Sequence, residues 1–276
     1  MIINEYVHLI RKDFFVTEDV KRYVNIYLIT GENCYLIDSG VSGSEILISE
    51  YMNSIGRKLA DIKGIFLTHA HPDHIGAAAE IKRQTGCQIF APNKGISWIE
   101  DIHKQFVERP IPNFFKLLSE SVNVDHPLQD KEEIKLEENI TIKALSTPGH
   151  SDDSMSYILN DNIVFTGDVI PAPNDLPIFV NYEECIRSID KIRNITEIEV
   201  CCPAWDKVYN REELLEILLK SEEKLYKLRA IVHEVELELP KSCEAEKNQE
   251  ICKRMNMQKF AGNPLFMKSI EACKEG

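Results

Sequence analysis

The sequence predicts an α/β fold made of two similar halves, followed by a helical C-terminal extension. Strand-like and helical segments alternate over residues 23–92. After an interruption the same order returns, with strands, a loop that carries candidate metal ligands, a helix and a further strand. From residue 210 onward the apolar spacing is helical alone. The two halves share only the order of their elements. The sequence contains no repeat of fixed period.

The first half reads as strands and helices separated by glycine-containing turns. Strands are expected where β-branched and aromatic residues concentrate between turn signals, and helices where a glycine closes an amphipathic stretch. The expected strands cover residues 23–30, 33–40, 62–69 and 87–92, and the expected helices cover 44–56 and 74–86.

The rhythm breaks over residues 93–130, which we interpret as a helical insertion rich in aromatic residues: Trp98, Phe106, Phe114 and Phe115. Strands then resume at 140–150, 155–161 and 162–168, followed by a helix at 182–194 and a strand at 197–205. The aromatic residues of the insertion either form a lid over a site or seal a small core of the insertion itself.

A long helix is expected from Asn210, which is a suitable N-cap because Glu212 and Glu213 follow in the first turn. Apolar residues recur at heptad-like spacing, with Ser221 at one seam position: Leu214, Leu218, Leu225, Leu228, Val232, Val235 and Leu239. The helix either packs on its own domain or forms the seam of a homodimer. Residues 260–276 predict one more short helix.

Composition excludes several classes of protein. The chain has 276 residues, 43% of them apolar, and a formal net charge of −13, which argues against binding to a nucleic-acid backbone. Its first residues lack the apolar core of a secretory signal, and no apolar stretch reaches the roughly 18 residues of a membrane span. Eight cysteines without a CxxC pair indicate reduced thiols and a cytoplasmic protein.

Residues 69–74 concentrate ligands for a metal ion. His69 and His71 are two positions apart on an extended segment, so their side chains project to the same side and can bind one ion. Pro72 turns the chain, which displaces Asp73 and His74 toward the position of a second ion, although Asp73 alone is also a good helix N-cap. Imidazole and carboxylate ligands without thiolates suit zinc, iron or manganese.

Three further loops supply what this cluster lacks. "STPGHS" places His150 in a glycine-shaped loop at the end of a strand, and "VFTGDV" places Asp168 where a carboxylate can bridge two ions. "LIDSG" places Asp38 at another strand end, where we expect it to orient a metal ligand or a bound water without binding metal itself.

In this order and spacing the motifs resemble those of the metallo-β-lactamase superfamily, over roughly residues 20–210. The resemblance implies a four-layer αββα sandwich with a metal site at one edge between two sheets. We therefore expect a metallo-β-lactamase-like catalytic domain at 1–209, including the insertion at 93–130, and a C-terminal helical extension at 210–276.

The resemblance also assigns roles to the ligands. His69, His71 and His150 would bind a first ion, Asp73 and His74 a second, and Asp168 would bridge the two. Members with two ions usually have a last histidine after the final core strand, but "CCPAWD" places Trp205 there. Asp206 is a candidate substitute ligand. A site for two ions, a site for one tightly bound ion and a degenerate site all remain open.

The expected reaction is hydrolysis by a metal-bound hydroxide, with Asp73 or Asp38 orienting or accepting the proton. We expect a small-molecule substrate, a thioester, ester or lactone, cleaved with one or two Zn²⁺ ions or with Fe²⁺ or Mn²⁺. Candidate pocket residues are Trp205, Trp98 and Phe106, with the loop at 171–177. The alternatives are an oxidoreductase resembling the mononuclear iron persulfide dioxygenases, or a non-catalytic metal-binding or sensing protein.

Overall fold

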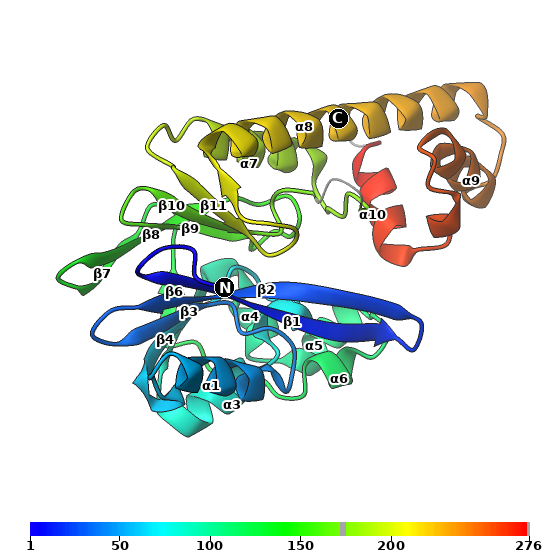
Figure 1. Cartoon of the computed structure of the whole chain (residues 1–276). Coiled ribbons are helices and arrows are strands. Elements are labelled where there is room, and N and C mark those ends of the chain that lie inside the picture. Colours follow the sequence, from blue (N-terminus) through cyan, green and yellow to red (C-terminus); the bar gives the residue numbers. More distant parts are fainter. Residues whose placement is uncertain (172–174, 275–276) are drawn as a thin grey trace.

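The computed structural model describes residues 1–171 and 175–274 and has four layers, with two six-stranded sheets packed face to face between helices (Figure 1). This confirms the predicted αββα sandwich with a C-terminal helical extension. Among the described residues, no helix combines the length and the apolar character that a membrane span needs. All eight cysteines are free thiols, as predicted.

The first sheet has the order β1-β2-β3-β4-β5-β6, in which β3 to β6 are parallel. Its strands are β1 (Val7–Thr17), β2 (Val20–Thr30), β3 (Cys34–Ile37), β4 (Ile62–Phe66), β5 (Gln88–Pro92) and β6 (His126–Leu128). Strand β1 was not predicted, because charged residues interrupt its apolar pattern. The insertion is helical at its start, as predicted, but its last part is β6.

The second sheet has the order β12-β11-β10-β9-β8-β7, in which β10 and β11 are parallel and the other described pairs are antiparallel. Its strands are β7 (Glu133–Glu137), β8 (Ile140–Ser146), β9 (Met155–Leu159), β10 (Ile163–Gly167), β11 (Val200–Pro203) and β12 (Tyr209–Asn210). Buried aromatic residues join the two sheets: the ring of Phe66 lies 5.4 Å from that of Tyr157, and Tyr27 lies 5.2 Å from Phe165.

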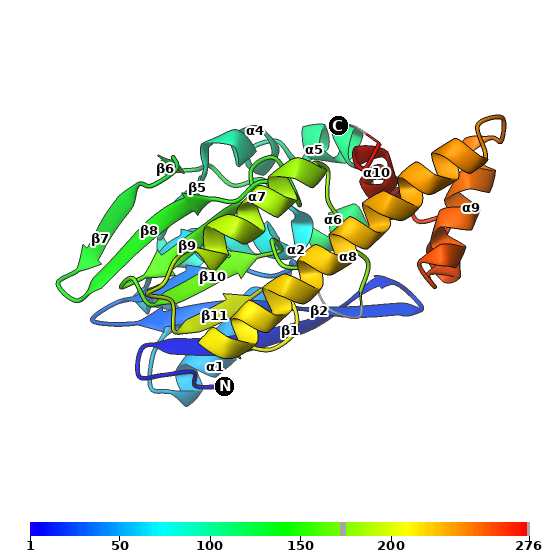
Figure 2. The ribbon, with the colours of Figure 1, turned by 90° about the horizontal axis from the view of Figure 1, so that it is seen from above.

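Helices cover the outer face of each sheet (Figures 1 and 2). The first half contributes α1 (Ser44–Ser54), η1 (Leu59–Asp61), α2 (Pro72–Ile75), α3 (Ala78–Thr85), η2 (Asn93–Gly95), α4 (Ile96–Ile99), α5 (Ile102–Glu108) and α6 (Phe114–Leu117). The second half contributes α7 (Tyr182–Arg193), α8 (Arg211–Glu238), α9 (Glu244–Arg254), η3 (Gln258–Phe260) and α10 (Pro264–Ala272).

The helix predicted at 74–86 is divided into α2 and α3. Gly76 donates its N–H to the carbonyl of Gly40 at 2.7 Å, outside the helix, so the helical hydrogen-bond ladder stops there. This bond fixes α2, which carries Asp73 and His74, against the end of β3. The division therefore serves the placement of candidate ligands.

Helix α8 runs across the second sheet and continues past it, carrying α9 and α10 to one side of the sandwich (Figure 2). Its predicted seam faces the protein itself: Leu214, Leu218, Leu225 and Val232 are fully buried in the core that α8 shares with the second sheet, α7, α9 and α10. A homodimer through α8 stays a prediction and would have to use its other face, where Leu219 and Leu237 are exposed.

Asn210 caps α8, as predicted, because its side chain accepts the N–H of Glu213 and the Glu213 carboxylate accepts the N–H of Asn210. We expect Asn210→Ala to lower the free energy of unfolding by about 1 kcal/mol, because it leaves an N–H of the first turn without its partner. Urea denaturation measures this change. Lys227→Ala on the exposed face of α8 is the control, and equal midpoints for the two variants would contradict the capping role.

Candidate metal centre

The candidate ligands lie at the carboxyl ends of strands from both sheets. Asp38 follows β3 and His69 follows β4, its parallel neighbour, so both leave the first sheet at the same edge. Asp168 follows β10 and Trp205 follows β11, which are parallel neighbours in the second sheet. The packing of the sheets brings these two edges together.

The backbone between His69 and His71 is held from both sides. The N–H of Ala70 donates to Asp153 Oδ2 at 2.8 Å, and its carbonyl accepts from Gln105 Nε2 at 2.6 Å. Asp153, Gln105 and Ala70 are all buried, so little solvent competes for these bonds. Both histidines therefore leave a fixed segment of backbone, which reduces the freedom of their side chains.

Two glycines place His150 and Asp168. Gly149 has φ +134°, and a Cβ there would lie 2.6 Å from the backbone nitrogen of Cys185, so only glycine fits. Gly167 has φ +53°, and a Cβ there would lie 2.8 Å from Thr68 Oγ1. The glycines of "STPGHS" and "VFTGDV" are thus required by the backbone that delivers the ligands.

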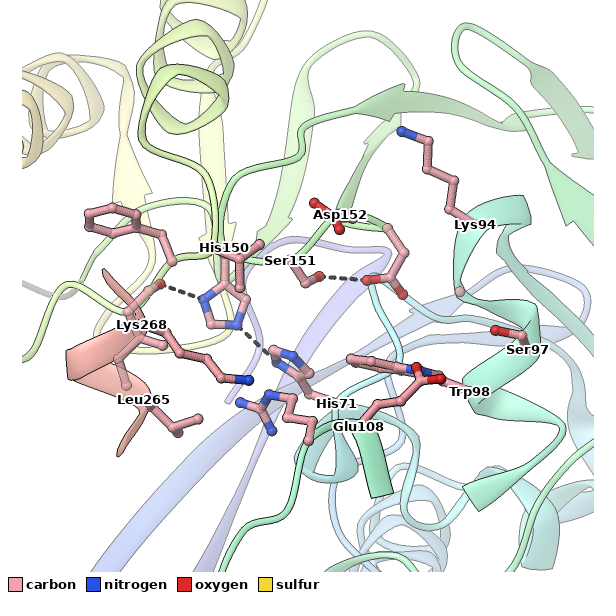
Figure 3. Close-up of a pocket in the computed structure, with 16 residues that line it drawn as sticks. His71, Lys94, Ser97, Trp98, Glu108, His150, Ser151, Asp152, Leu265 and Lys268 are labelled. Carbon is pink, nitrogen blue, oxygen red and sulfur yellow. Dashed lines mark hydrogen bonds between the residues drawn. The ribbon is translucent and has the colours of Figure 1, made fainter. Parts of the chain in front are cut away.

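Three histidine nitrogens converge at one point. His71 Nδ1 lies 2.9 Å from His69 Nε2 and 2.9 Å from His150 Nε2, and all three side chains are buried. His150 Nδ1 lies 2.8 Å from the carbonyl of Ile178, which can only accept, so Nδ1 carries the proton and Nε2 presents a lone pair. Figure 3 shows His150 and His71 facing one another.

The tautomer of His69 follows from the same logic. The Thr68 hydroxyl donates to Asp38 Oδ2 at 2.9 Å, so at 3.0 Å from His69 Nδ1 it can only accept. Nδ1 of His69 therefore carries the proton, and Nε2 presents a lone pair toward His71. Burial, first of all, lowers the pKa of His69 and of His71 well below the usual value and lowers that of His150. Neutral imidazoles are the form that binds metal.

His74, Asp168 and His69 form a second group of potential ligands beside the first. Asp168 lies between the two groups, with Oδ2 3.4 Å from His150 Nε2 and Oδ1 3.2 Å from His74 Nε2. Burial raises the pKa of Asp168, but His74 and His150 outweigh this effect and hold it well below its usual range. Asp168 is thus ionised and placed where a bridging carboxylate would lie.

Asp38 orients His74. Its Oδ2 lies 2.7 Å from His74 Nδ1, and its Oδ1 accepts the N–H of Thr68 at 2.8 Å. Burial lowers the pKa of His74, but Asp168, Asp38 and Asp73 together raise it well above the usual value. Asp38 contacts His74 from behind, the position expected for a group that positions a ligand.

Asp73 lies in the first turn of α2, whose N-cap is His71, so Asp73 is not the N-cap. Its Oδ2 is 3.8 Å from His74 Nε2, and its side chain is 20% exposed. Asp73 is thus beside the second group and in contact with solvent.

Trp205 contacts Asp168 directly. Its Nε1–H donates to Asp168 Oδ1 at 2.7 Å, on the carboxylate oxygen that faces His74. Arg22 stacks over the Trp205 ring at 4.5 Å. The structure does not bring Asp206 to the centre, because its carboxylate accepts from the Tyr209 hydroxyl at 2.5 Å. Asp206 as a substitute ligand stays a prediction without a contact to support it.

A cavity of about 290 Å³ opens beside the histidines (Figure 3). Of the three predicted pocket residues, Trp98 lines it, whereas Phe106 and Trp205 do not. Phe106 packs against Phe114 and Phe115, with ring centroids 5.3 and 4.9 Å away, and so seals the core of the insertion. In the predicted loop at 171–177, residues 172–174 lie outside the described residues.

Sequence reasoning missed several residues that shape this region. Gln105 and Asp153 hold the segment of His69 and His71, and neither belongs to a metal-ligand motif. Arg109 from the insertion, and Leu265 and Lys268 from α10, line the cavity. The second aspartate of "SDDS" was the only signal in the sequence that could have indicated Asp153.

These residues fit a metal ion. His71 Nδ1 lies within hydrogen-bond distance of two ring nitrogens whose lone pairs are set by outer partners, and one ring N–H cannot fully satisfy both. Within the described residues, His74 Nε2 is buried and forms no hydrogen bond of good geometry, although Asp168 Oδ1 lies 3.2 Å away. A bound cation would satisfy the ring nitrogens of the three histidines and that of His74. Zinc is suited to such a set of nitrogen and carboxylate oxygen ligands.

Comparisons with known proteins identify the family to which this chain is similar. A model of the metallo-beta-lactamase superfamily matches residues 20–203. The probable metallo-hydrolase YybB of Bacillus subtilis is 28% identical over 215 residues, which cover 75% of this chain and 92% of that protein. A hydroxyacylglutathione hydrolase from a Bradyrhizobium species is 31% identical over 124 residues, 45% of this chain and 38% of that protein.

A solved metallo-beta-lactamase family protein from Thermus thermophilus has the same fold, with a TM-score of 0.73 at 18% identity. The match covers 99% of this chain and 95% of that one, so the shared fold includes the C-terminal helices.

Trp205→His is expected to add a nitrogen ligand beside Asp168 and His74 and to raise the zinc content by about one equivalent per chain. Elemental mass spectrometry after zinc loading and removal of free metal measures this content. Trp205→Phe, the control, removes the indole N–H without adding a ligand and should leave the zinc content unchanged. Equal zinc contents in the two variants would show that position 205 does not limit the second ion.

Proposed function

The chain belongs to the metallo-beta-lactamase superfamily, and from that premise we propose that it is a metal-dependent hydrolase of a small thioester, ester or lactone. The observation that carries this proposal is the convergence of His69, His71 and His150, with the ionised Asp168 beside them. A structural role explains this group poorly, because three buried imidazoles that face one another stabilise little without a shared cation.

His69, His71 and His150 would hold a zinc ion, and His74, Asp168 and Asp73 would hold a second one if it binds. A bound zinc ion supplies Lewis acidity, which polarises a carbonyl and lowers the pKa of a bound water to about 7. The protein then has to orient the ligands, admit the substrate and move protons.

The residues of the chain are suited to these tasks. Asp38 fixes the ring of His74, and Ile178 fixes the ring of His150, so the ligands do not have to reorganise during a reaction. Asp73 is the least buried of the candidate carboxylates, at 20% exposure against 11% for Asp168 and 3% for Asp38. We assign to Asp73 the acceptance of a proton from the attacking water and its release to solvent.

The relatives support a thioester or a related carbonyl substrate. One is named a hydroxyacylglutathione hydrolase, and an acylglutathione is a thioester. The cavity beside His71 and His150 has about 290 Å³, which suits a small substrate. Activity with iron alone, accompanied by oxidation of a persulfide and no ester hydrolysis, would favour the oxidoreductase alternative.

We expect His69→Ala to reduce kcat/KM for a generic thioester at least about 10³-fold, because it removes one of three nitrogens that hold the ion. His103→Ala, an exposed histidine of the insertion, serves as the control and should retain activity. Thiol release followed with a colorimetric thiol reagent measures hydrolysis.

Both variants are assayed after zinc, manganese and iron(II) loading, and far-ultraviolet circular dichroism verifies that each is folded. Undiminished hydrolysis by folded His69→Ala would contradict the role of the centre. Absence of hydrolysis in the unmodified protein with every ester, thioester and lactone tested would favour a metal-binding or sensing role.

A further inference from the structure

The cavity beside the candidate metal centre carries three basic side chains: Lys94, Arg109 and Lys268. They come from different parts of the chain, with Lys94 in η2, Arg109 directly after α5 and Lys268 in α10. His71 and His150 form part of the same wall. The cavity thus connects a basic region with the place where the chemistry would occur.

These cations lack the partners that most basic side chains of an acidic protein find. Within residues 1–171 and 175–274, none of the three forms an ion pair or a side-chain hydrogen bond, although the chain has a net charge of −13. Two carboxylates of the cavity are already engaged: Glu108 accepts from Trp98 Nε1 at 2.6 Å, and Asp153 accepts from Ala70. A third carboxylate, Asp152, also lines the cavity, but it forms no ion pair with Lys94, Arg109 or Lys268 in the described residues. The three basic groups therefore remain available to an anionic ligand.

Arg109 is fixed relative to the centre. Its backbone N–H donates to the carbonyl of Gln105 at 2.7 Å, and the side chain of Gln105 donates to the carbonyl of Ala70, between His69 and His71. Its side chain lines the same cavity as His71 and His150, so its charge acts on the region of the centre. An arginine held in this way can form two parallel hydrogen bonds to a carboxylate or phosphate.

Lys268 is coupled to the centre through α10. The neighbouring Ser269 accepts the N–H of Phe179 at 2.9 Å and donates to the carbonyl of Phe179 at 3.1 Å. The preceding residue, Ile178, orients His150. One short segment thus positions both a candidate metal ligand and the helix that carries Lys268. Figure 3 shows Lys268 extending from α10 toward His71 and His150, with Lys94 well apart from it.

We propose that Arg109 and Lys268 form an anion-binding subsite beside the metal centre that recognises a carboxylate or phosphate group of the substrate distinct from the scissile carbonyl. This inference rests on the proposed hydrolase function and names its substrate class: small acyl esters or thioesters that carry an oxyanion group. The metal centre holds the carbonyl group, and the two basic residues hold the anionic group, so their contribution appears mainly in KM.

The test compares three thioesters that share one acyl length and end in a carboxylate, a phosphate or a neutral carboxamide. Arg109→Gln and Lys268→Gln are each expected to lower kcat/KM for the anionic substrate about 10- to 100-fold, through KM, with little change for the carboxamide. Lys104→Gln on the exposed side of α5 is the matched control and should behave as the unmodified protein. Whichever anion shows the larger loss identifies the group that is recognised.

Zinc content and circular dichroism show whether each variant keeps its metal and its fold. Equal preference of the unmodified protein for charged and neutral substrates, or equal losses for both in the variants, would overturn the subsite while leaving the hydrolase function intact.

Binding measured without turnover separates the two proposals. Calorimetric titration of the zinc-loaded protein with glutarate, and separately with inorganic phosphate, should show binding of at least one ion that the Arg109→Gln/Lys268→Gln double variant loses about 100-fold. This result would support the subsite even if no ester were hydrolysed. Equal binding to the double variant and to the unmodified protein would overturn it.

Discussion

The candidate metal centre depends on hydrogen bonds between its histidine rings and residues around it. These bonds fix the ring tautomers so that the lone pairs point into the centre. The carbonyl of Ile178 holds the proton of His150 on Nδ1, and the Thr68 hydroxyl, committed as a donor to Asp38, does the same for His69. In each of these two histidines, Nε2 is therefore unprotonated, and its lone pair is directed at His71. The outer partners thus create a set of lone pairs that a cation, and little else, can satisfy.

The fold supplies those partners from separate parts of the chain. Parallel strands of each sheet end at one edge, which brings Asp38 and His69 from the first sheet to Asp168 from the second. The insertion contributes Gln105 behind the metal-binding segment, and α10 is bonded to Phe179, next to Ile178. The C-terminal extension is consequently part of the site's construction, and the shared fold of the Thermus thermophilus protein includes it.

Much of this arrangement was predictable from sequence because it follows local rules. Regular apolar patterns indicated the positions of strands such as β4 and β10, and the motifs placed Asp38 and Asp168 directly at strand ends. Asn210 was recognisable as a cap because its partner Glu213 is only three residues away. Strand β1 was not predicted, because its outward residues are charged. The break between α2 and α3 was not predicted either, because it depends on a hydrogen bond to Gly40, which is distant in sequence.

The cavity was the least predictable part, because it is made by contacts between residues far apart in sequence. Phe106 and Trp98 have similar aromatic character and belong to one insertion, yet only Trp98 reaches the cavity wall. Lys268 lies nearly 120 residues after His150, and only the packing of α10 on Phe179 brings it there. Trp205 was expected in the pocket, whereas its contact is with the carboxylate of Asp168.

The most direct test of the central claim is long-range ¹H–¹⁵N correlation spectroscopy of the histidine rings in zinc-loaded protein, because ¹⁵N shifts distinguish protonated, bare and metal-bound nitrogens. We predict that His69 and His150 carry the proton on Nδ1 and bind zinc through Nε2, while His71 binds through Nδ1. A proton on Nε2 of His69 or His150, or rings that do not respond to zinc, would contradict a metal centre built by these outer hydrogen bonds.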